Sequence, residues 1–326
     1  MKKSEFVTII IALLVIAALI GCSKDSPVVP EEKDPIAVNK ALATRHLTEV
    51  WNQGKLNVLD EIATADFVFH FGSQDISGTA AYKQFITIHR TAFPDLNFTI
   101  DEQVAESNMV GTRYTTTGTH KGELSGIPPT NIQTTMTGIG ITRIDNNKLA
   151  EAWVYDDQAG LLIQLGVLPE MGMEYTWSEP LPPGNNTGDL EKNKTLVTRV
   201  PEWFNSGDTT IAHDIFAENL VNHFPNFPSA ANLEGIKQFC AVSRMEWPNF
   251  HVTIDEMIAE GNFVLVHWTA TGTHQGGVIF PPTGKQVAWR GITIWRVAGD
   301  KIVEGWWSQD MYGLLVQLGI VPPPSG

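Results

Sequence analysis

One long segment of the sequence occurs twice, and this repeat limits the chain to folds built from two similar units. The segment EAWVYDDQAGLL begins at Glu151 and returns as EGWWSQDMYGLL from Glu304, an offset of 304 − 151 = 153 residues. Two copies are too few for a solenoid, which needs at least about three stacked repeats. We therefore expect two domains that either close their own cores or pack together as an internal pseudo-dimer.

Length and composition fit two domains. A chain of 326 residues, of which 43% are hydrophobic, exceeds one ordinary domain and can bury sizeable cores. Residues 169–189 are rich in proline, glycine and asparagine and are predicted to form a linker. The other predicted parts are a signal segment over 1–21, a tether over 22–35, and domains over 36–168 and 190–322.

Within each unit, helical patterns precede extended patterns. In the first unit, Asp34-Pro35 has the residues of a helix start, and two further helical patterns follow it, the second over 78–90. The strands predicted for this unit cover 66–71, 98–104, 109–120, 133–144 and 148–155. Helices followed by an antiparallel meander predict an α+β fold, not a doubly wound sheet.

The N-terminus has the pattern of a targeting segment. Lys2 and Lys3 precede an apolar run over 6–20, whose 15 residues fall short of the roughly 20 that span a membrane. The sequence Leu-Ile-Gly-Cys22 resembles a bacterial lipobox, which implies cleavage before Cys22 and lipidation of its thiol. Ser23 then favours the outer membrane or cell surface, so we expect a cell-envelope lipoprotein. An ordinary cleaved signal peptide and an N-terminal anchor helix are the alternatives.

The charge balance argues against one class of partner. The formal net charge is −14, and no basic patch interrupts the acidic sequence. Nucleic-acid binding needs lysine and arginine to neutralise phosphates. We therefore expect no nucleic-acid partner.

The repeated segment carries the candidate chemistry. Alternation along a strand places Trp153, Tyr155 and Asp157 on one face, and Trp306 and Asp310 take the same places in the second copy. This pattern favours a carboxylate in an aromatic-walled hollow, where desolvation raises its pKa and suits it to general acid/base work. The alternative is a solvated acid at a strand end that caps the following helix.

Several motifs recur in the same order in both units. They are Gly-Thr-His-x-Gly, Pro-Pro-Thr, a strand ending in arginine, and Glu-x-Trp-x-x-x-Asp-x-x-Gly-Leu-Leu-x-Gln-Leu-Gly. In combination the chain resembles a tandem pair of SnoaL-like polyketide cyclase domains, also called ester cyclases, of the nuclear-transport-factor-2-like fold. The resemblance covers nearly all of 36–168 and 190–320. It implies two cone-shaped domains, each a strongly curved antiparallel sheet wrapped around N-terminal helices, with an apolar pocket and without a metal or organic cofactor.

The resemblance also implies residue roles. An aspartate near the end of the last long strand acts as acid/base in the aldol closure of such cyclases, and Asp157 and Asp310 match that position. A histidine assists there from the preceding strand, a place held here by Arg143 and Arg296. A guanidinium beside an aspartate lowers the aspartate's pKa, or it stabilises an enolate oxyanion.

Four histidines are further candidates. His120 and His274 lie in glycine-flanked turns, whereas His70 and His223 follow apolar strand residues and face either the pocket or the outer layer. For His120 and His274 the alternative role is to satisfy backbone groups. Neither pair has the helical spacing of metal ligands, so we expect no metal site. The second unit is richer in tryptophan, and we expect Trp306 in particular to contact a ligand.

The sequence therefore predicts a lipid-anchored, cofactor-independent protein that transfers protons on a small apolar carbonyl or ester compound. The predicted reaction is of the cyclase or isomerase-type lyase kind, with Asp157 and Asp310 as acid/base. One alternative is a non-catalytic protein that binds a hydrophobic small molecule at the cell envelope. The other is a scaffold whose pockets are vestigial.

Overall fold

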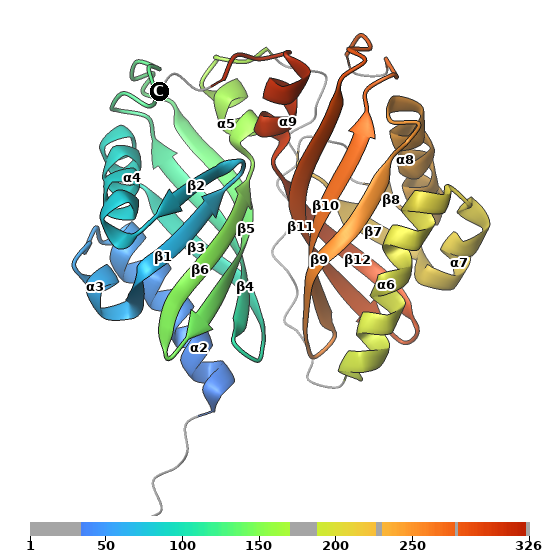
Figure 1. Ribbon diagram of the computed structural model, residues 1–326, viewed down its shortest axis with the longest axis horizontal. Coiled ribbons are helices and arrows are strands. Elements are labelled where there is room, and N and C mark those ends of the chain that lie inside the picture. Colours follow the sequence, from blue (N-terminus) through green and yellow to red (C-terminus); the bar gives the residue numbers. More distant parts are fainter. Residues whose placement is uncertain (1–33, 170–187, 226–229, 278–279, 324–326) are drawn as a thin grey trace, which may run out of the picture. The chain divides into compact units, whose positions relative to one another are not determined.

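Each repeat folds into helices that pack against one six-stranded sheet, which confirms the α+β class with two tandem domains (Figure 1). The computed structural model describes residues 34–169, 188–225, 230–277 and 280–323. The predicted signal segment, the cysteine predicted to be lipidated, Cys22, and most of the predicted linker lie outside these residues.

In the first domain three helical segments precede the first strand, one lies between the second and third strands, and one follows the last strand. Its sheet has the strand order β2-β1-β6-β5-β4-β3. The elements are α2 (Pro35–Arg45), the π-helix η1 (His46–Asn52), α3 (Val58–Ile62), β1 (Ala63–Phe71), β2 (Gln74–Ser77), α4 (Thr79–Ala92), β3 (Asn97–Glu106), β4 (Met109–Thr119), β5 (Gln133–Asp145), β6 (Lys148–Asp156) and α5 (Gln158–Gln164).

The second domain repeats this order. Its sheet is β8-β7-β12-β11-β10-β9. The elements are α6 (Leu190–Ser206), the 3-10 helix η2 (Thr209–Ile211), α7 (Ala212–Ile215), β7 (Phe216–His223), β8 (Ala230–Ala231), α8 (Leu233–Glu246), β9 (His251–Glu260), β10 (Phe263–Thr273), β11 (Gln286–Ala298), β12 (Lys301–Gln309) and α9 (Met311–Leu318).

Local sequence explains where these elements begin and turn. Helix α2 starts at Pro35, because proline at a first helical position has no N–H that needs an intrahelical partner. The β5–β6 hairpin turns through Asn146 and Asn147, whose φ angles of 51° and 58° suit a two-residue type I′ turn. This turn fixes the pairing of the two strands that carry most of the repeated motif.

Three features depart from the predicted elements. The short edge strands β2 and β8 were not predicted, and strand β1 pairs with β6 in parallel, within a sheet predicted to be antiparallel. The first domain also contains the π-helix His46–Asn52 where the second continues as an α-helix. From Lys40 to Trp51 the first repeat is one residue longer than the matching stretch from Lys194 to Phe204, and a π-turn absorbs such an extra residue.

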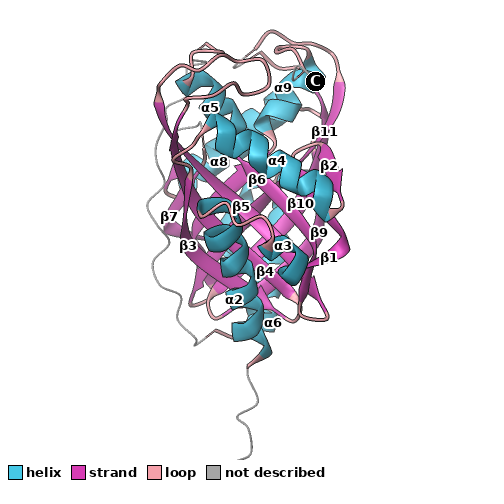
Figure 2. Cartoon of the chain, turned by 90° about the vertical axis from the view of Figure 1, so that its left-hand side faces the viewer, coloured by secondary structure: helices cyan, strands magenta, loops and turns pink. Residues whose placement is uncertain are grey.

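Both faces of each sheet are buried. Figure 2 shows α2, α3 and α4 across one face of the first sheet, where the core of the first domain lies. The opposite face packs against the sheet of the second domain, and both domains belong to one compact unit that begins at Pro35. The buried residues between the sheets are Val104, Met109, Ile139, Ile141, Tyr155, Ile258, Phe263, Leu265, Ile292, Ile294 and Trp306.

Two glutamates tie the domains together in a reciprocal way. The Glu106 carboxylate accepts a hydrogen bond from the Ala259 N–H at 2.8 Å, and the Glu260 carboxylate accepts one from the Ala105 N–H at 2.7 Å. Each glutamate also pairs with a lysine of the other domain, Lys194 in one case and Lys40 in the other. The same contact is thus made twice, once from each domain, as expected for two domains related by a pseudo-twofold axis.

Polar contacts also cross the centre of the interface. The Tyr155 hydroxyl lies 2.9 Å from His267 Nε2, and the Ser308 hydroxyl donates to the Tyr155 carbonyl at 2.8 Å. In the first domain the place of His267 is taken by Arg113, which forms a buried ion pair with Asp101. The two halves of the interface are therefore similar but not identical.

We expect Glu106→Ala to lower the free energy of unfolding by about 1–3 kcal/mol, because it leaves the Ala259 N–H without its acceptor in a partly buried contact. Urea titration measures this change. The control is Glu256→Ala on the same strand as Ala259, where the side chain is exposed and the change should stay within about 0.5 kcal/mol. Equal losses in the two variants would contradict a stabilising role for Glu106.

Candidate functional site

Each domain holds a cavity between its sheet and its helices. The cavity of the second domain has a volume of about 320 Å³, and that of the first about 90 Å³. In both, the walls include alternate residues of the sheet strands and residues of the long helices. The two cavities occupy matching positions in the repeat but have different linings.

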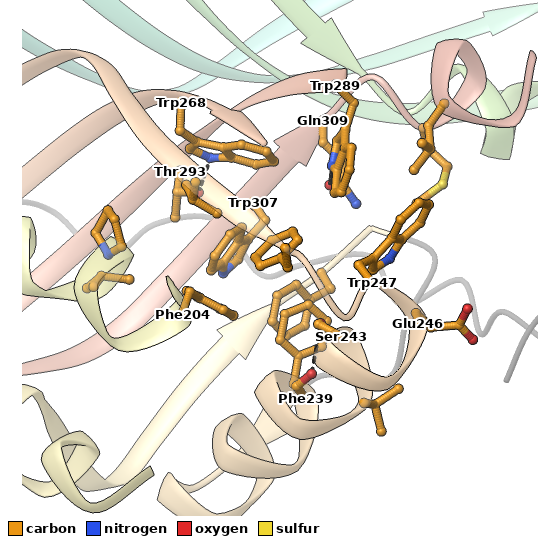
Figure 3. A pocket seen from close by; sticks show the side chains of 18 of the residues that line it. Phe204, Phe239, Ser243, Glu246, Trp247, Trp268, Trp289, Thr293, Trp307 and Gln309 are labelled. Carbon is orange, nitrogen blue, oxygen red and sulfur yellow. Dashed lines mark hydrogen bonds between the residues drawn. The ribbon is translucent and has the colours of Figure 1, made fainter. Parts of the chain in front are cut away.

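Aromatic rings form the walls of the cavity in the second domain (Figure 3). The Trp295 and Trp307 rings meet edge-on at 5.2 Å, and the Trp247 and Trp289 rings lie 5.1 Å apart. Such rings present flat apolar surfaces to a ligand. The aromatic lining residues are Phe204, Phe224, Phe239, Trp247, Phe250, Trp268, Phe280, Trp289, Trp295 and Trp307.

Polar groups of this cavity are largely paired with one another. Trp268 Nε1 donates to the Thr293 hydroxyl at 2.9 Å, and the Ser243 hydroxyl donates to the Phe239 carbonyl at 2.8 Å (Figure 3). A further pair is His274 Nε2 and the Glu246 carboxylate, 3.0 Å apart and both buried. The cavity therefore presents a mostly apolar surface to whatever enters it.

The cavity of the first domain is far more polar. Thr142 stands where the second domain has Trp295, and Thr112 stands where it has Val266. The polar residues that line the first cavity are His46, His89, Thr112, Tyr114, Thr116, Thr117, Thr134, Thr142 and Asp156. The first domain thus holds a smaller, more polar cavity and the second a larger, more apolar one.

Asp156, the last residue of β6, is the acid in the first cavity. Its Oδ1 is buried and has no hydrogen-bond partner among the described residues. The pKa of Asp156 is raised to about 7, chiefly by burial and also by the charges of Asp157 and Asp310, while a hydrogen bond from Gln158 opposes the rise. Asp156 therefore has both protonation states available near neutral pH.

Tyr114 lies next to this acid. Strand pairing aligns Tyr114 with Gly138 and Gly138 with Asp156, so all three are neighbours on the cavity side of the sheet. A Cβ at Gly138 would lie 2.5 Å from the Tyr114 hydroxyl, which shows that the ring fills the space left by the glycine. Burial and the Asp156 charge raise the pKa of Tyr114 well above its usual value, so its hydroxyl stays protonated and can donate.

The π-helix positions His46, another polar residue of the cavity lining. His46 Nε2 lies 2.7 Å from the Tyr82 hydroxyl, which also accepts a hydrogen bond from Trp51 Nε1 at 2.9 Å. Burial lowers the pKa of His46 to about 4, so its ring is neutral at physiological pH. The neutral ring can accept a hydrogen bond from the Tyr82 hydroxyl, so these three side chains are hydrogen-bonded without any charge.

The two aspartates predicted as acid/base residues are helix caps. Asp157 accepts from the Gly160 N–H at 2.9 Å, and Asp310 accepts from the Gly313 N–H at 2.8 Å. Neither lines a cavity. The expected position was wrong because β6 ends at Asp156, so strand alternation does not extend to Asp157. Capping was the alternative left open by the sequence.

The aromatic residues predicted to contact a ligand, Trp153, Tyr155 and Trp306, face the other domain and not a cavity. Tyr155 and Trp306 belong to the core between the two sheets, and Trp153 packs against it. Alternation does place Trp153 and Tyr155 on one face, but that face meets the other domain. The cavity is lined instead by the intervening Val154 and, in the second domain, by Trp307.

The predicted arginines also lie on the far side of the sheet from the cavities. Arg143 pairs with Glu151, and Arg296 pairs with Glu304 at 2.7 Å. Neither arginine lines a cavity, and neither is placed to stabilise an oxyanion there. The reason is again alternation, because Arg143 follows Ile141 on the face that meets the other domain.

His70 and His223 join these arginine–glutamate pairs. His70 Nε2 lies 2.9 Å from Glu151, and His223 Nε2 lies 3.0 Å from Glu304. Each imidazole also stacks on the tryptophan of its motif, with ring centroids 5.3 Å apart in both copies. The two histidines therefore face away from the cavities.

His120 and His274 hold loops together. His120 Nδ1 accepts from the Thr130 N–H, and His274 Nδ1 accepts from the Thr283 N–H, both at 3.3 Å. These bonds connect the Gly-Thr-His motif to the Pro-Pro-Thr motif in each copy. Only His274 of the two also lines a cavity.

Sequence reasoning missed Asp156 and its counterpart Gln309. A signal was present, because the repeats differ there while the neighbours Asp157 and Asp310 agree. Among the described residues, no group of three or more histidine, cysteine, aspartate or glutamate side chains is arranged to hold a metal ion. None of the helices in the same residues combines the length and apolarity that crossing a bilayer requires.

Comparison with known proteins gives a family match for both domains. A family model described as SnoaL-like polyketide cyclase matches residues 41–165 and 194–318. No protein with a curated description matches the chain.

Three solved structures illustrate the similarity. A candidate SnoaL-like polyketide cyclase from Jannaschia sp. CCS1 is 21% identical with a TM-score of 0.40, over 43% of this chain and 99% of that one. AclR, a candidate hydroxylase from Streptomyces galilaeus, is 28% identical with a TM-score of 0.38, over 41% and 88%. A candidate polyketide cyclase from Acidithiobacillus ferrooxidans is 27% identical with a TM-score of 0.38, over 41% and 97%.

The pKa of Asp156 predicts how stability depends on pH. Folding raises this pKa from an ordinary value near 4 to about 7, so the folded state binds more protons in that window and loses stability as pH rises. Asp156→Asn abolishes this loss. Urea titration gives the free energy of unfolding of Asp156→Asn minus that of the unsubstituted protein. This difference should be larger at pH 8 than at pH 5 by about 2 kcal/mol. In the control Asp66→Asn, where the side chain is exposed, this difference should not change with pH. If the difference for Asp156→Asn is the same at both pH values, the raised pKa is contradicted.

Proposed function

Because this chain belongs to the SnoaL-like polyketide cyclase family, we propose that its first domain performs cofactor-independent acid/base chemistry on a small apolar carbonyl or ester compound. Asp156 exchanges the proton. The observation that supports this proposal is a carboxyl oxygen buried against the cavity, without a partner among the described residues, in a group whose pKa is about 7. A general acid/base works best when its pKa lies near the operating pH.

The chemistry has two steps. The Asp156 carboxylate takes a proton from the carbon next to the substrate carbonyl, so a C–H bond breaks, an O–H bond forms on Asp156, and the electron pair passes into an enolate. The Tyr114 hydroxyl, which lies beside Asp156 across Gly138, donates a hydrogen bond to the enolate oxygen. Asp156 then returns the proton to carbon or to oxygen, which leaves the protein unchanged.

Asp157 and Asp310 serve this chemistry as positioning residues. Their negative charges raise the pKa of Asp156, and Asp310 does so from the other domain. Asp157 also caps α5, whose Leu161 lines the cavity. Their recurrence in both repeats is thus compatible with a shared structural role.

Proton exchange at a small ketone tests this proposal. Cyclopentanone is incubated with the protein in D2O, and loss of its α-proton signal is followed by NMR. We expect catalysed exchange to rise with pH through an apparent pKa of about 7 and to fall roughly 100-fold or more in Asp156→Asn. Exchange at the unchanged rate in Asp156→Asn would exclude this residue as the base.

The control for that experiment is Asp157→Asn. Asparagine is also a good N-cap, so the α5 helix stays capped. Loss of the Asp157 charge removes one cause of the raised pKa of Asp156, so the apparent pKa of exchange should move to lower pH while the exchange persists. An unmoved profile would show that Asp157 has no electrostatic effect on the base.

We also propose that the chain is a cell-envelope lipoprotein anchored through Cys22. The sequence Leu-Ile-Gly-Cys22 after the apolar run supports this proposal. In cells of a bacterial host, labelled palmitate should be incorporated into the full chain and into the control Ser23→Ala, and not into Cys22→Ala. Labelling of Cys22→Ala would contradict lipidation at this cysteine.

A further inference from the structure

We propose that the second domain is a binding domain that holds an uncharged aromatic carbonyl compound without transforming it. In this proposal the side-chain amide of Gln309 donates a hydrogen bond to the carbonyl oxygen of the ligand. The inference stands on the cavity of the second domain and does not require Asp156 to be catalytic.

The size and walls of the cavity indicate the class of ligand. A volume of about 320 Å³ lies at the lower end of the range of roughly 300–1,000 Å³ found for small-molecule sites. The rings of Trp268, Trp295 and Trp307 meet at steep angles of 64° and 84°, so they form several walls of one space. A compact ligand of two or three fused rings fits such walls, because aromatic faces pack against aromatic edges.

The electrostatics of the lining exclude a charged ligand. Glu246 is the acid in this lining, and it pairs with His274 at 3.0 Å. A carboxylate on the ligand would lose its hydration without gaining an opposite charge, and an ammonium group would meet only a carboxylate that is already paired with His274, so either charge costs several kcal/mol. The ligand is therefore neutral.

Gln309 supplies the polar contact. Trp289 Nε1 lies 3.2 Å from Gln309 Oε1, and because an indole N–H can only donate, the amide must turn its oxygen to Trp289 (Figure 3). The amide nitrogen then has no acceptor among the described residues, and Gln309 lines the cavity. Because the amide nitrogen of Gln309 carries two N–H donors in an apolar cavity, it favours a ligand that places a hydrogen-bond acceptor, such as a ketone oxygen, next to it.

The same residues explain why this domain should bind without catalysis. Gln309 holds the place of Asp156, and an amide neither takes nor releases a proton at neutral pH. Trp268 holds the place of Tyr114 and lies over Gly291, where a Cβ would come within 2.4 Å of its ring. Both groups that are proposed to move or stabilise charge in the first domain are thus replaced here.

Two matched ligands test the proposal on the full chain. 9-Fluorenone and fluorene share their ring system, and only fluorenone has a carbonyl oxygen. Quenching of tryptophan fluorescence, with five tryptophans in the lining, reports binding. We expect fluorenone to bind roughly fivefold more tightly than fluorene, the effect of about one hydrogen bond, and the anion 9-fluorenone-4-carboxylate to bind at least about tenfold more weakly than fluorenone.

Three variants locate the site. Gln309→Met should abolish the preference for fluorenone and keep the affinity for fluorene, whereas Ser243→Phe should weaken both ligands by filling the cavity. Asp156→Asn should leave fluorenone binding unchanged whether or not it abolishes proton exchange, so the two proposals fail separately. Circular dichroism confirms that each variant is folded. The proposal is overturned if fluorenone does not bind, if it binds no better than fluorene, if the anion binds equally well, or if Gln309→Met keeps the preference.

Discussion

A β-strand points successive side chains to opposite faces, and in β6 and β12 both faces are buried. One face meets the other domain and the other lines a cavity. Tyr155 and Trp306 therefore lie in the interface between the domains. The residues that alternate with them along each strand, among them Asp156 and Gln309, line the cavities. Shifting either strand by one residue would exchange these roles, so the pairing of β6 and β12 with their neighbours decides which chemistry each cavity has.

The motifs shared by the two repeats are mainly architectural. A Cβ at Gly122 or at Gly276 would lie 2.3 or 2.4 Å from the backbone at the end of α4 or α8, so these glycines let the loop touch the helix end. Gln164 bonds to both backbone groups of Thr135 and so holds α5 against β5. The differences between the repeats, such as Thr112 against Val266 and Thr142 against Trp295, make the first cavity more polar than the second, and Asp156 against Gln309 decides which cavity holds a titratable group at that place.

The sequence was sufficient to predict the order of helices and strands because hydrophobic spacing and turn residues are local signals. Helix α2 begins at Pro35 as predicted, and β5 and β6 lie within one residue of their predicted bounds. The orientation of the faces could not be predicted in the same way. A strand buried on both sides has no polar face to mark the outside, so Trp153 and Val154 were equally good candidates for the cavity. The parallel β1–β6 pair depends on contacts between distant segments, which local patterns do not encode.

The contact between the sheets also couples the two domains electrostatically. Tyr155 lies between two residues that line the first cavity, and its hydroxyl reaches His267, which lies between two residues that line the second. Asp310 acts across the same contact and raises the pKa of Asp156. The second domain thus helps to set the protonation of the first, since separating the domains would remove the effect of the Asp310 charge on Asp156. A domain that has Gln309 where its partner has Asp156 can for this reason still contribute to the chemistry, because its Asp310 adds to the rise in the pKa of Asp156.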